Sequence, residues 1–206
     1  MLKRLFGRNK PQSTQPSLPS TWKRVAWQNP RIPYLDYFNL HLHGLTFEKA
    51  IRSLEAKYLN ATVMAPAILV WQQREWINAY FARDLVAAVG FNKLSNEIAR
   101  EHEIWLIGYR IYAEQGIDVH YFHGNDHVAG LAVGEDELER EPLAAEAFAP
   151  LADVSHLIPR PEPLHPLDFH FGLLEAVGIQ DAALTWDEVL RRYKVGELTG
   201  AKLLPV

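Results

Sequence analysis

Histidines and aspartates are concentrated in one short stretch of the chain, which makes this stretch the first candidate for chemistry. It contains the pattern His120-x-x-His123-x-x-x-His127, with Asp118 and Asp126 beside the histidines. Imidazole and carboxylate groups together suit zinc, iron or manganese. His120, His123, Asp126 and His127 are therefore a candidate ligand set for a divalent transition metal, such as a metal-dependent hydrolase would use.

Two further imidazoles come from a distant part of the chain. His41 and His43 lie two residues apart, so on a strand they would share one face and could join such a site. His120 and His123 lie three apart, point to opposite faces of a strand, and converge only if the strand bends. The alternative places these histidines at the wet edge of a β-hairpin, without a metal.

Five acidic side chains follow closely after the histidine stretch. They are Glu135, Asp136, Glu137, Glu139 and Glu141. One interpretation is a docking surface for a basic protein, in which the carboxylates occupy places that phosphates would take. The other is the solvated start of a helix, where acidic groups favour the positive end of the helix dipole.

The sequence contains none of the signatures that identify the commonest enzyme classes. It has no phosphate-binding loop, dinucleotide glycine fingerprint, nucleophile elbow or His-Glu-x-x-His helix. It also has no cysteine, which excludes a disulfide framework, a thiolate zinc site and a cysteine nucleophile, and which favours a cytoplasmic location. A binding protein without a cofactor is therefore the favoured class.

The charges are divided unevenly along the chain. The net charge is −4, but residues 1–35 carry +7 and the remaining 171 residues carry −11. An acidic body disfavours non-specific nucleic-acid binding and suits a basic protein partner. No apolar run reaches the ~18–20 residues that a membrane span needs, so stable membrane insertion is not expected.

The composition predicts one folded domain behind a leader. Residues 1–21 are basic at first and then rich in proline, serine, threonine and glutamine, which predicts a flexible leader. Residues 1–10 would attach weakly to an anionic membrane if their few apolar side chains formed an amphipathic turn, and a frayed terminus is the favoured interpretation. Residues 22–206 have the length and apolar content of a single domain.

The first half of this domain predicts a helix followed by two strands. Residues 46–58 keep apolar side chains at the helical period behind a capping Thr46. Residues 62–71 and 75–82 are rich in β-branched and aromatic side chains and are joined by a polar turn. The alternative is one long helix between Pro66 and Gly90, because short apolar runs do not settle the choice by period.

The middle of the domain predicts a helix and a hairpin. Residues 92–102 are helical in pattern, and residues 103–112 and 117–123 alternate as two strands joined by a turn that ends at Gly116. The alternative is a helix that runs from Ser95 and is capped by Gly116.

The remaining residues predict mostly helices. Residues 124–134 predict a loop and a short strand, and residues 135–149 an acidic and then alanine-rich helix. Two C-terminal helices follow, one between Pro166 and Gly178 and one that opens with a capping box at Thr185. The fold class predicted for the domain is α+β, with an antiparallel β-sheet built of hairpins and packed helices.

An ordered series of elements runs through residues 75–123. An aromatic strand at Trp76–Phe81 precedes a helix at Leu94-Ser95-Asn96-Glu97, and a hairpin from Tyr109–Tyr112 to Val119–Phe122 follows. This series covers about a quarter of the chain and resembles small bacterial α+β proteins that are immunity partners of secreted or contact-delivered toxins. The resemblance implies a stoichiometric binder and transfers no functional residue, because such proteins share a shape and no catalytic motif.

We therefore expect a protein-binding module, of the immunity type, that neutralises a toxin by covering a basic active site. The expected partner-binding residues are the five acidic residues between Glu135 and Glu141. The alternative function is a metal-dependent hydrolase that uses the His120, His123, Asp126 and His127 set.

Overall fold

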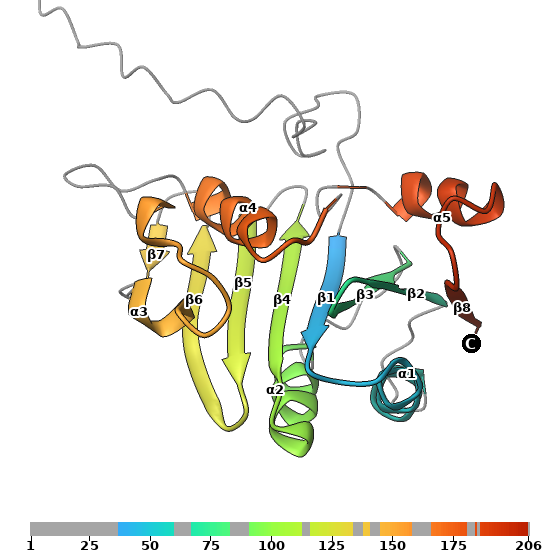
Figure 1. Cartoon of the computed structure of the whole chain (residues 1–206), viewed down its shortest axis with the longest axis horizontal. Helices are drawn as coiled ribbons and strands as arrows, with labels where there is room; N and C mark the ends of the chain where they lie inside the picture. The colour runs from blue at the N-terminus through green and yellow to red at the C-terminus, as the bar shows by residue number, and fades with distance from the viewer. Residues whose placement is uncertain are drawn as a thin grey trace, which may run out of the picture.

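The computed structural model describes residues 37–59, 67–82, 91–112, 116–133, 138–140, 145–157, 166–180, 184 and 186–205. The described strands are β1 (Tyr37–His43), β2 (Ala67–Gln73), β3 (Trp76–Phe81), β4 (Trp105–Tyr112), β5 (Gly116–His123), β6 (Asp126–Val133), β7 (Leu138–Arg140) and β8 (Lys202–Pro205). They form one antiparallel eight-stranded sheet in the order β7-β6-β5-β4-β1-β3-β2-β8 (Figure 1).

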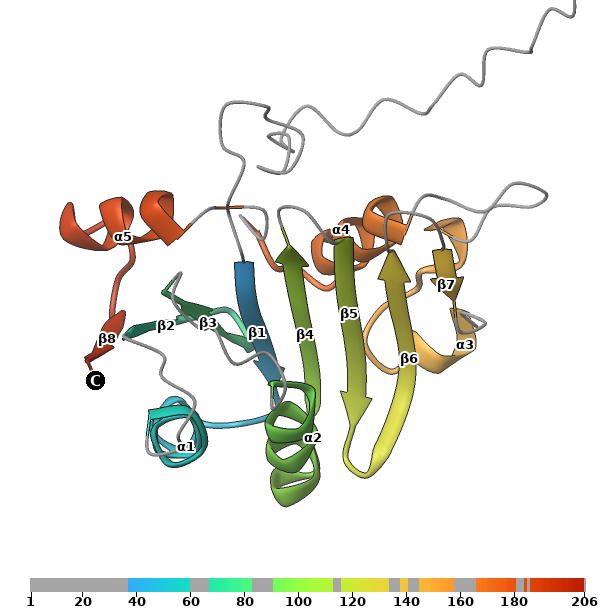
Figure 2. The same cartoon turned by 180° about the vertical axis from the view of Figure 1, so that it is seen from behind.

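Helices cover both faces of this sheet. The described helices are α1 (Phe47–Leu54) with a π-helical turn (Glu55–Leu59), α2 (Phe91–His102), α3 (Ala145–Phe148), a 3-10 turn (Ser155–Leu157), α4 (Pro166–Ala176) and α5 (Trp186–Lys194). Figures 1 and 2 show α4 on one side of the sheet and α2 on the other. The architecture is α+β, as the sequence predicts.

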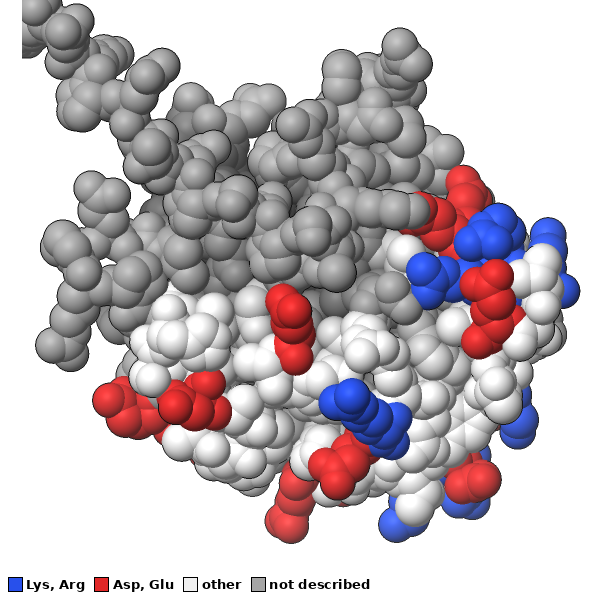
Figure 3. Space-filling view, turned by 45° about the horizontal axis from the view of Figure 1, so that its top comes forward, with Lys and Arg blue, Asp and Glu red and all other residues white. Residues whose placement is uncertain are grey.

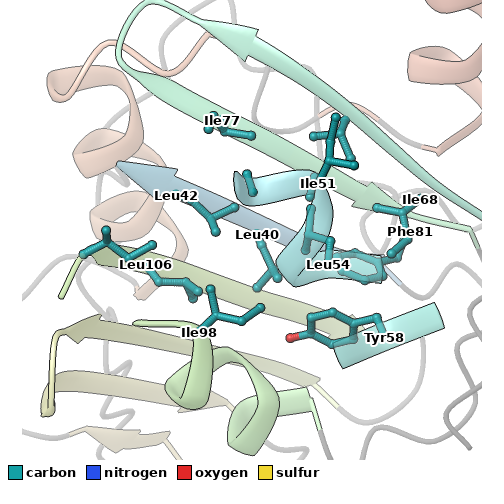
Figure 4. Close-up of a cluster of buried hydrophobic side chains, with 14 of the residues drawn as sticks. Leu40, Leu42, Ile51, Leu54, Tyr58, Ile68, Ile77, Phe81, Ile98 and Leu106 are labelled. Carbon is teal, nitrogen blue, oxygen red and sulfur yellow. The ribbon is translucent and has the colours of Figure 1, made fainter. Parts of the chain in front are cut away.

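One core lies between the sheet and the helices α1 and α2. Alternate residues of the central strands point to this face, because successive side chains of a strand point to opposite sides. The cluster includes Leu40, Leu42, Ile77 and Leu106 from four positions on the sheet, and Figure 4 shows Leu54 of α1 reaching into it. These side chains are fully buried, so the helical period of α1 and the two-residue period of the strands meet in a single apolar layer.

The opposite face of the sheet carries two smaller cores. Under α4 and α3, the aromatic side chains of Trp105, Tyr121 and Phe148 pack with Leu173 and other apolar groups. Beneath α5, Val189 packs on the part of the sheet formed by β2 and β3. The sheet is therefore buried on both faces at its centre, and β3 is buried along its whole length.

The β2–β3 hairpin is joined to the end of α4. Its two-residue loop contains Arg74 at a φ of 56°, and the flanking Gln73 accepts a hydrogen bond from the backbone N–H of Gln180 at 3.1 Å. The indole Nε1 of Trp76 donates to the carbonyl oxygen of Val177 at 3.0 Å. These bonds satisfy backbone groups just beyond the helix, where the chain leaves α4 and intrahelical partners end.

Both hairpins that the sequence predicts are confirmed, and the two long-helix alternatives are wrong. The π-helical turn after α1 continues the predicted helix of residues 46–58, and Thr46 caps it by accepting from the backbone N–H of Lys49 at 3.4 Å. The helix predicted at residues 92–102 is confirmed as α2. The helix predicted to end at Gly178 is confirmed as α4, with a φ of 85° at that glycine.

The loop and strand predicted within residues 124–134 are confirmed, although the strand β6 has eight residues rather than few. The continuous helix predicted over residues 135–149 is wrong, because the described residues of this range form the edge strand β7 and the four-residue α3. The pairing of β7 with β6 outweighs the helical propensity of the acidic run. The strand β8 was not predicted, and the leader of residues 1–21 lies outside the described residues.

Among the described residues, no helix is long and apolar enough to cross a membrane.

The contact between the π-helical turn and α2 gives a test of this packing. The buried hydroxyl of Tyr58 forms a 2.9 Å hydrogen bond with the hydroxyl of Ser95. We expect Tyr58→Phe and Ser95→Ala each to lower the free energy of unfolding by about 1–2 kcal/mol, because each removes one partner of a buried hydrogen bond. Urea denaturation of the double variant should show a loss smaller than the sum, by about 1 kcal/mol.

The half-buried Tyr193 of α5 supplies the control for this double-mutant cycle. Tyr193→Phe combined with Ser95→Ala should give additive losses, because the two residues belong to helices on opposite faces of the sheet. Equal coupling in both pairs would contradict the packing described for Tyr58.

Candidate functional site

The β5–β6 hairpin carries most of the histidine stretch. Its loop consists of Gly124 and Asn125, and Gly124 has a φ of 56°, which a residue without a side chain adopts readily. The register shifts between Tyr121 and Phe122, so that Phe122 lies opposite His127. Such a bulge bends and twists a strand locally, and here it lies directly beside the histidines.

Two of the histidines are in contact on the α2 side of the sheet. Nδ1 of His120 lies 3.1 Å from Nε2 of His127, within hydrogen-bonding distance. Their rings also contact Phe122, with centroid separations of 5.9 Å for His120 and 5.2 Å for His127. Phe122 is buried in the core, while His127 is exposed. We call His120, Phe122 and His127 the hairpin ring cluster.

The other members of the predicted metal set do not join this cluster. His123 lies on the opposite face, where its ring stacks on Trp105 at 4.6 Å with an interplanar angle of 16°. Asp126 is exposed and lies opposite His123 in the register. Within the described part of the chain, no three His, Cys, Asp or Glu side chains form a group that could hold a metal ion. The side chain of Asp118 lies outside the described set.

His41 and His43 share a face of β1 but have different surroundings. His43 is half-buried, lies against the ring of Trp76 at 5.0 Å, and has its Nε2 3.3 Å from a carboxylate oxygen of the exposed Glu75. His41 is fully buried, and its Nδ1 forms a 2.6 Å hydrogen bond with the amide oxygen of Asn78 on β3. Neither side chain lies in the hairpin ring cluster.

A second buried histidine, His170 of α4, lies near His41. Its Nδ1 forms a 3.0 Å hydrogen bond with the hydroxyl of Tyr121, and both side chains are fully buried. Together, His41, Asn78, Tyr121 and His170 make up a polar network in the core on the α4 side of the sheet, which we call the buried histidine network. Its members come from β1, β3, β5 and α4.

Burial keeps this network uncharged. It lowers the pKa of His41 to about 4, against the opposing effect of the Asn78 hydrogen bond. Burial also lowers the pKa of His170 well below its ordinary value, and the neighbouring His41 lowers it further. The pKa of Tyr121 is raised well above its ordinary value by the same desolvation. At neutral pH the network therefore consists of neutral hydrogen-bonding groups.

Neither Asn78 nor His170 was singled out from the sequence. Asn78 is a lone amide in the strand Trp76–Phe81, and His170 is a lone imidazole in the apolar helix Pro166–Ala176. A polar residue at a position that the period assigns to the core is the signal that would have marked both. What no period reveals is that α4 places His170 over Tyr121.

One described residue of the acidic run, Glu139, lies at an edge of the sheet. Glu139 belongs to β7 and pairs with Ala132 of β6, and β7 is the terminal strand of the sheet order. Glu135, Asp136, Glu137 and Glu141 lie outside the residues whose placement is described. In the sequence, these four residues lie on either side of the edge strand β7, and Glu139 lies within it.

The described surface elsewhere is mixed in sign. Its described side chains include thirteen acidic and ten basic residues, and Figure 3 shows the two signs interspersed on the face that it presents. The described part of the body is therefore less acidic than it would be if the net charge were distributed evenly over the whole body. Most of the excess belongs to other segments, including the run of residues 135–141.

Comparison of the chain with protein-family models, with curated proteins and with solved structures gave no match.

The buried histidine network makes stability depend on pH. In the unfolded chain His41 takes up a proton near pH 6.5, whereas the folded protein resists protonation until about pH 4. The free energy of unfolding should therefore have its full value above pH 6.5 and should fall as the pH drops from 6.5 toward 4. His41 alone should account for a loss of about 3 kcal/mol over this window, measured by urea denaturation at several pH values.

Removing the titrating group should flatten this dependence. We expect His41→Gln to reduce the slope of unfolding free energy against pH between 4 and 6.5, whatever its effect at pH 7.5. His156→Gln, at an exposed position in the 3-10 turn, should leave the slope unchanged. An unaltered slope in His41→Gln would refute the assignment.

Proposed function

We propose that this chain is a protein-binding module that docks through its acidic sheet edge. The observation that carries the proposal is that Glu139 lies in the terminal strand β7, with the other residues of the acidic run on either side of this strand in the sequence. One side of β7 pairs with β6, and in the described part of the sheet no strand pairs with its other side. A sheet edge offers backbone donors and acceptors to a partner, and flanking acids favour a basic one.

Within this class, we propose an immunity protein that covers the basic active site of a toxin in the cytoplasm. Two features of the sequence support the narrower proposal. The series of elements in residues 75–123 resembles that of immunity proteins, and the body of the chain is acidic. A toxin that cleaves or binds nucleic acid presents basic groups to phosphates, and carboxylates can occupy those positions.

The proposed mechanism is occlusion by a pre-formed surface. The edge strand is held by the β6 ladder, so little backbone ordering is needed when a partner binds there. Long-range attraction between the acidic run and a basic cleft would speed encounter and depend steeply on salt. Short-range pairing at β7 would then set the lifetime of the complex.

The metal-dependent hydrolase is the weaker candidate. The three protein ligands and open position of a catalytic zinc site would have to come from the histidine stretch. His123 stacks on Trp105, on the face of the sheet opposite to His120 and His127. The four-residue ligand set that motivated a hydrolase is therefore not assembled by the described residues.

Neutralising the acidic run tests the docking proposal. The variant Glu135→Gln, Asp136→Asn, Glu137→Gln, Glu139→Gln, Glu141→Gln removes five charges. The binding partner is first isolated by testing the products of the neighbouring genes for a stoichiometric complex with this chain. Its encounter with the variant should slow about tenfold or more at low salt, because steering by the acidic edge is lost. Stopped-flow association at low and physiological salt gives the rate, and growth of cells that express the toxin reports protection.

A charge-matched control separates the edge from net charge. Glu48, Glu103, Glu146, Glu175 and Asp187 are all exposed on other described elements. Their joint conversion to amides removes the same charge and should change the association rate by less than about threefold. Equal slowing by both variants would overturn docking at the β7 edge, and absence of any complex with the neighbouring gene products would overturn the immunity assignment.

A further inference from the structure

We propose that His120 and His127 form a two-histidine surface site for a divalent transition metal of the copper or zinc class. The site is the open end of the hairpin ring cluster, and it uses two of the four residues of the predicted metal set. It does not rest on the proposed docking function, since it lies on β5 and β6 rather than on β7.

The separation of the two nitrogen atoms matches the bite of a metal. Imidazole nitrogens lie about 2.0–2.1 Å from zinc, so two ligands of a tetrahedral ion are about 3.3 Å apart and two adjacent ligands of an octahedral ion about 3.0 Å apart. Nδ1 of His120 and Nε2 of His127 are 3.1 Å apart. The donor ring must first shift its proton to its other ring nitrogen. A small rotation of the exposed His127 ring then brings both lone pairs onto one ion in place of the hydrogen bond.

The hairpin holds the two imidazoles close before any metal arrives. The two-residue loop and the register shift fix His127 opposite Phe122, and the buried Phe122 ring contacts both imidazoles. Gly130 lies opposite His120 and has no side chain to compete for that cross-strand position. Pre-organisation of this kind lowers the entropy cost of bringing two ligands together.

The ligand chemistry selects the class of ion. Two neutral imidazoles suit copper, nickel and zinc, with copper bound most tightly in the usual order of divalent ions. Magnesium and calcium prefer oxygen ligands and should not bind. Because the described residues supply no third ligand, water or another small ligand fills the remaining positions, and the ion should exchange freely and be removed by a chelator.

Calorimetric titration of the full chain with zinc chloride, and separately with copper sulfate, tests the site. The wild-type protein should take up about one equivalent of zinc, and His120→Gln and His127→Gln should each weaken zinc binding at least about tenfold by removing one of two ligands. The electron paramagnetic resonance spectrum of the copper complex should show two bound nitrogens in the wild-type protein and fewer in each variant.

His123→Gln is the matched control. His123 is exposed on the same hairpin but stacks on Trp105 on the other face, so its loss should change zinc affinity less than about twofold. His127 is exposed, so the His127→Gln variant should keep the wild-type circular dichroism spectrum. Uptake below a tenth of an equivalent by the wild-type protein, unchanged binding by His127→Gln, or equal weakening by His123→Gln would each overturn the site.

Discussion

The structure depends on burying the central strands on both faces of the sheet. β3 has no exposed side chain, and β4 sends alternate residues into the cores on either side. β1 sends Leu40 and Leu42 to one side and the buried polar residues Asn39 and His41 to the other. A strand of this kind needs a helical layer above and below, which α1 and α2 supply on one side and α4 and α5 on the other. The same constraint places polar residues at the centre of these strands in the interior. Asn78 and His41 are there for this reason, and each must find its hydrogen bond within the fold.

Much of the sheet could be predicted from local pattern. The strand Trp76–Phe81 is short, aromatic and β-branched, and the polar pair Arg74 and Glu75 separates it from an equally apolar strand. Such signals lie within a few residues of one another, and the turn between them fixes the register. The edges were not predictable in this way. Leu138–Arg140 is too short to carry a period, and Lys202–Pro205 is a strand because it pairs with β2, which lies far away in the sequence.

The candidate sites show the same difference between features set by local pattern and features set by long-range contacts. Spacing correctly placed His120 and His123 on opposite faces, because that follows from the strand period alone. His127 comes close to His120 because of a register shift in the hairpin, and no residue of the stretch predicts that shift. The buried histidine network needs still more, since it joins three strands to a helix that comes about fifty residues after β5. The periodicity of a sequence does not predict which side chains meet through tertiary packing.

The late position of β8 has a consequence for synthesis of the chain. β2 has a continuous apolar run from Ala67 to Trp71, and in the described sheet the side of β2 that does not pair with β3 pairs with Lys202–Pro205. About 130 residues separate the two strands, so at a translation rate of roughly 5–20 residues per second β2 waits about 6–26 s for its neighbour to be made. During that interval an apolar strand edge is open to other nascent chains. A chaperone that holds the unfinished sheet would therefore matter more for the yield of this protein than for its final stability.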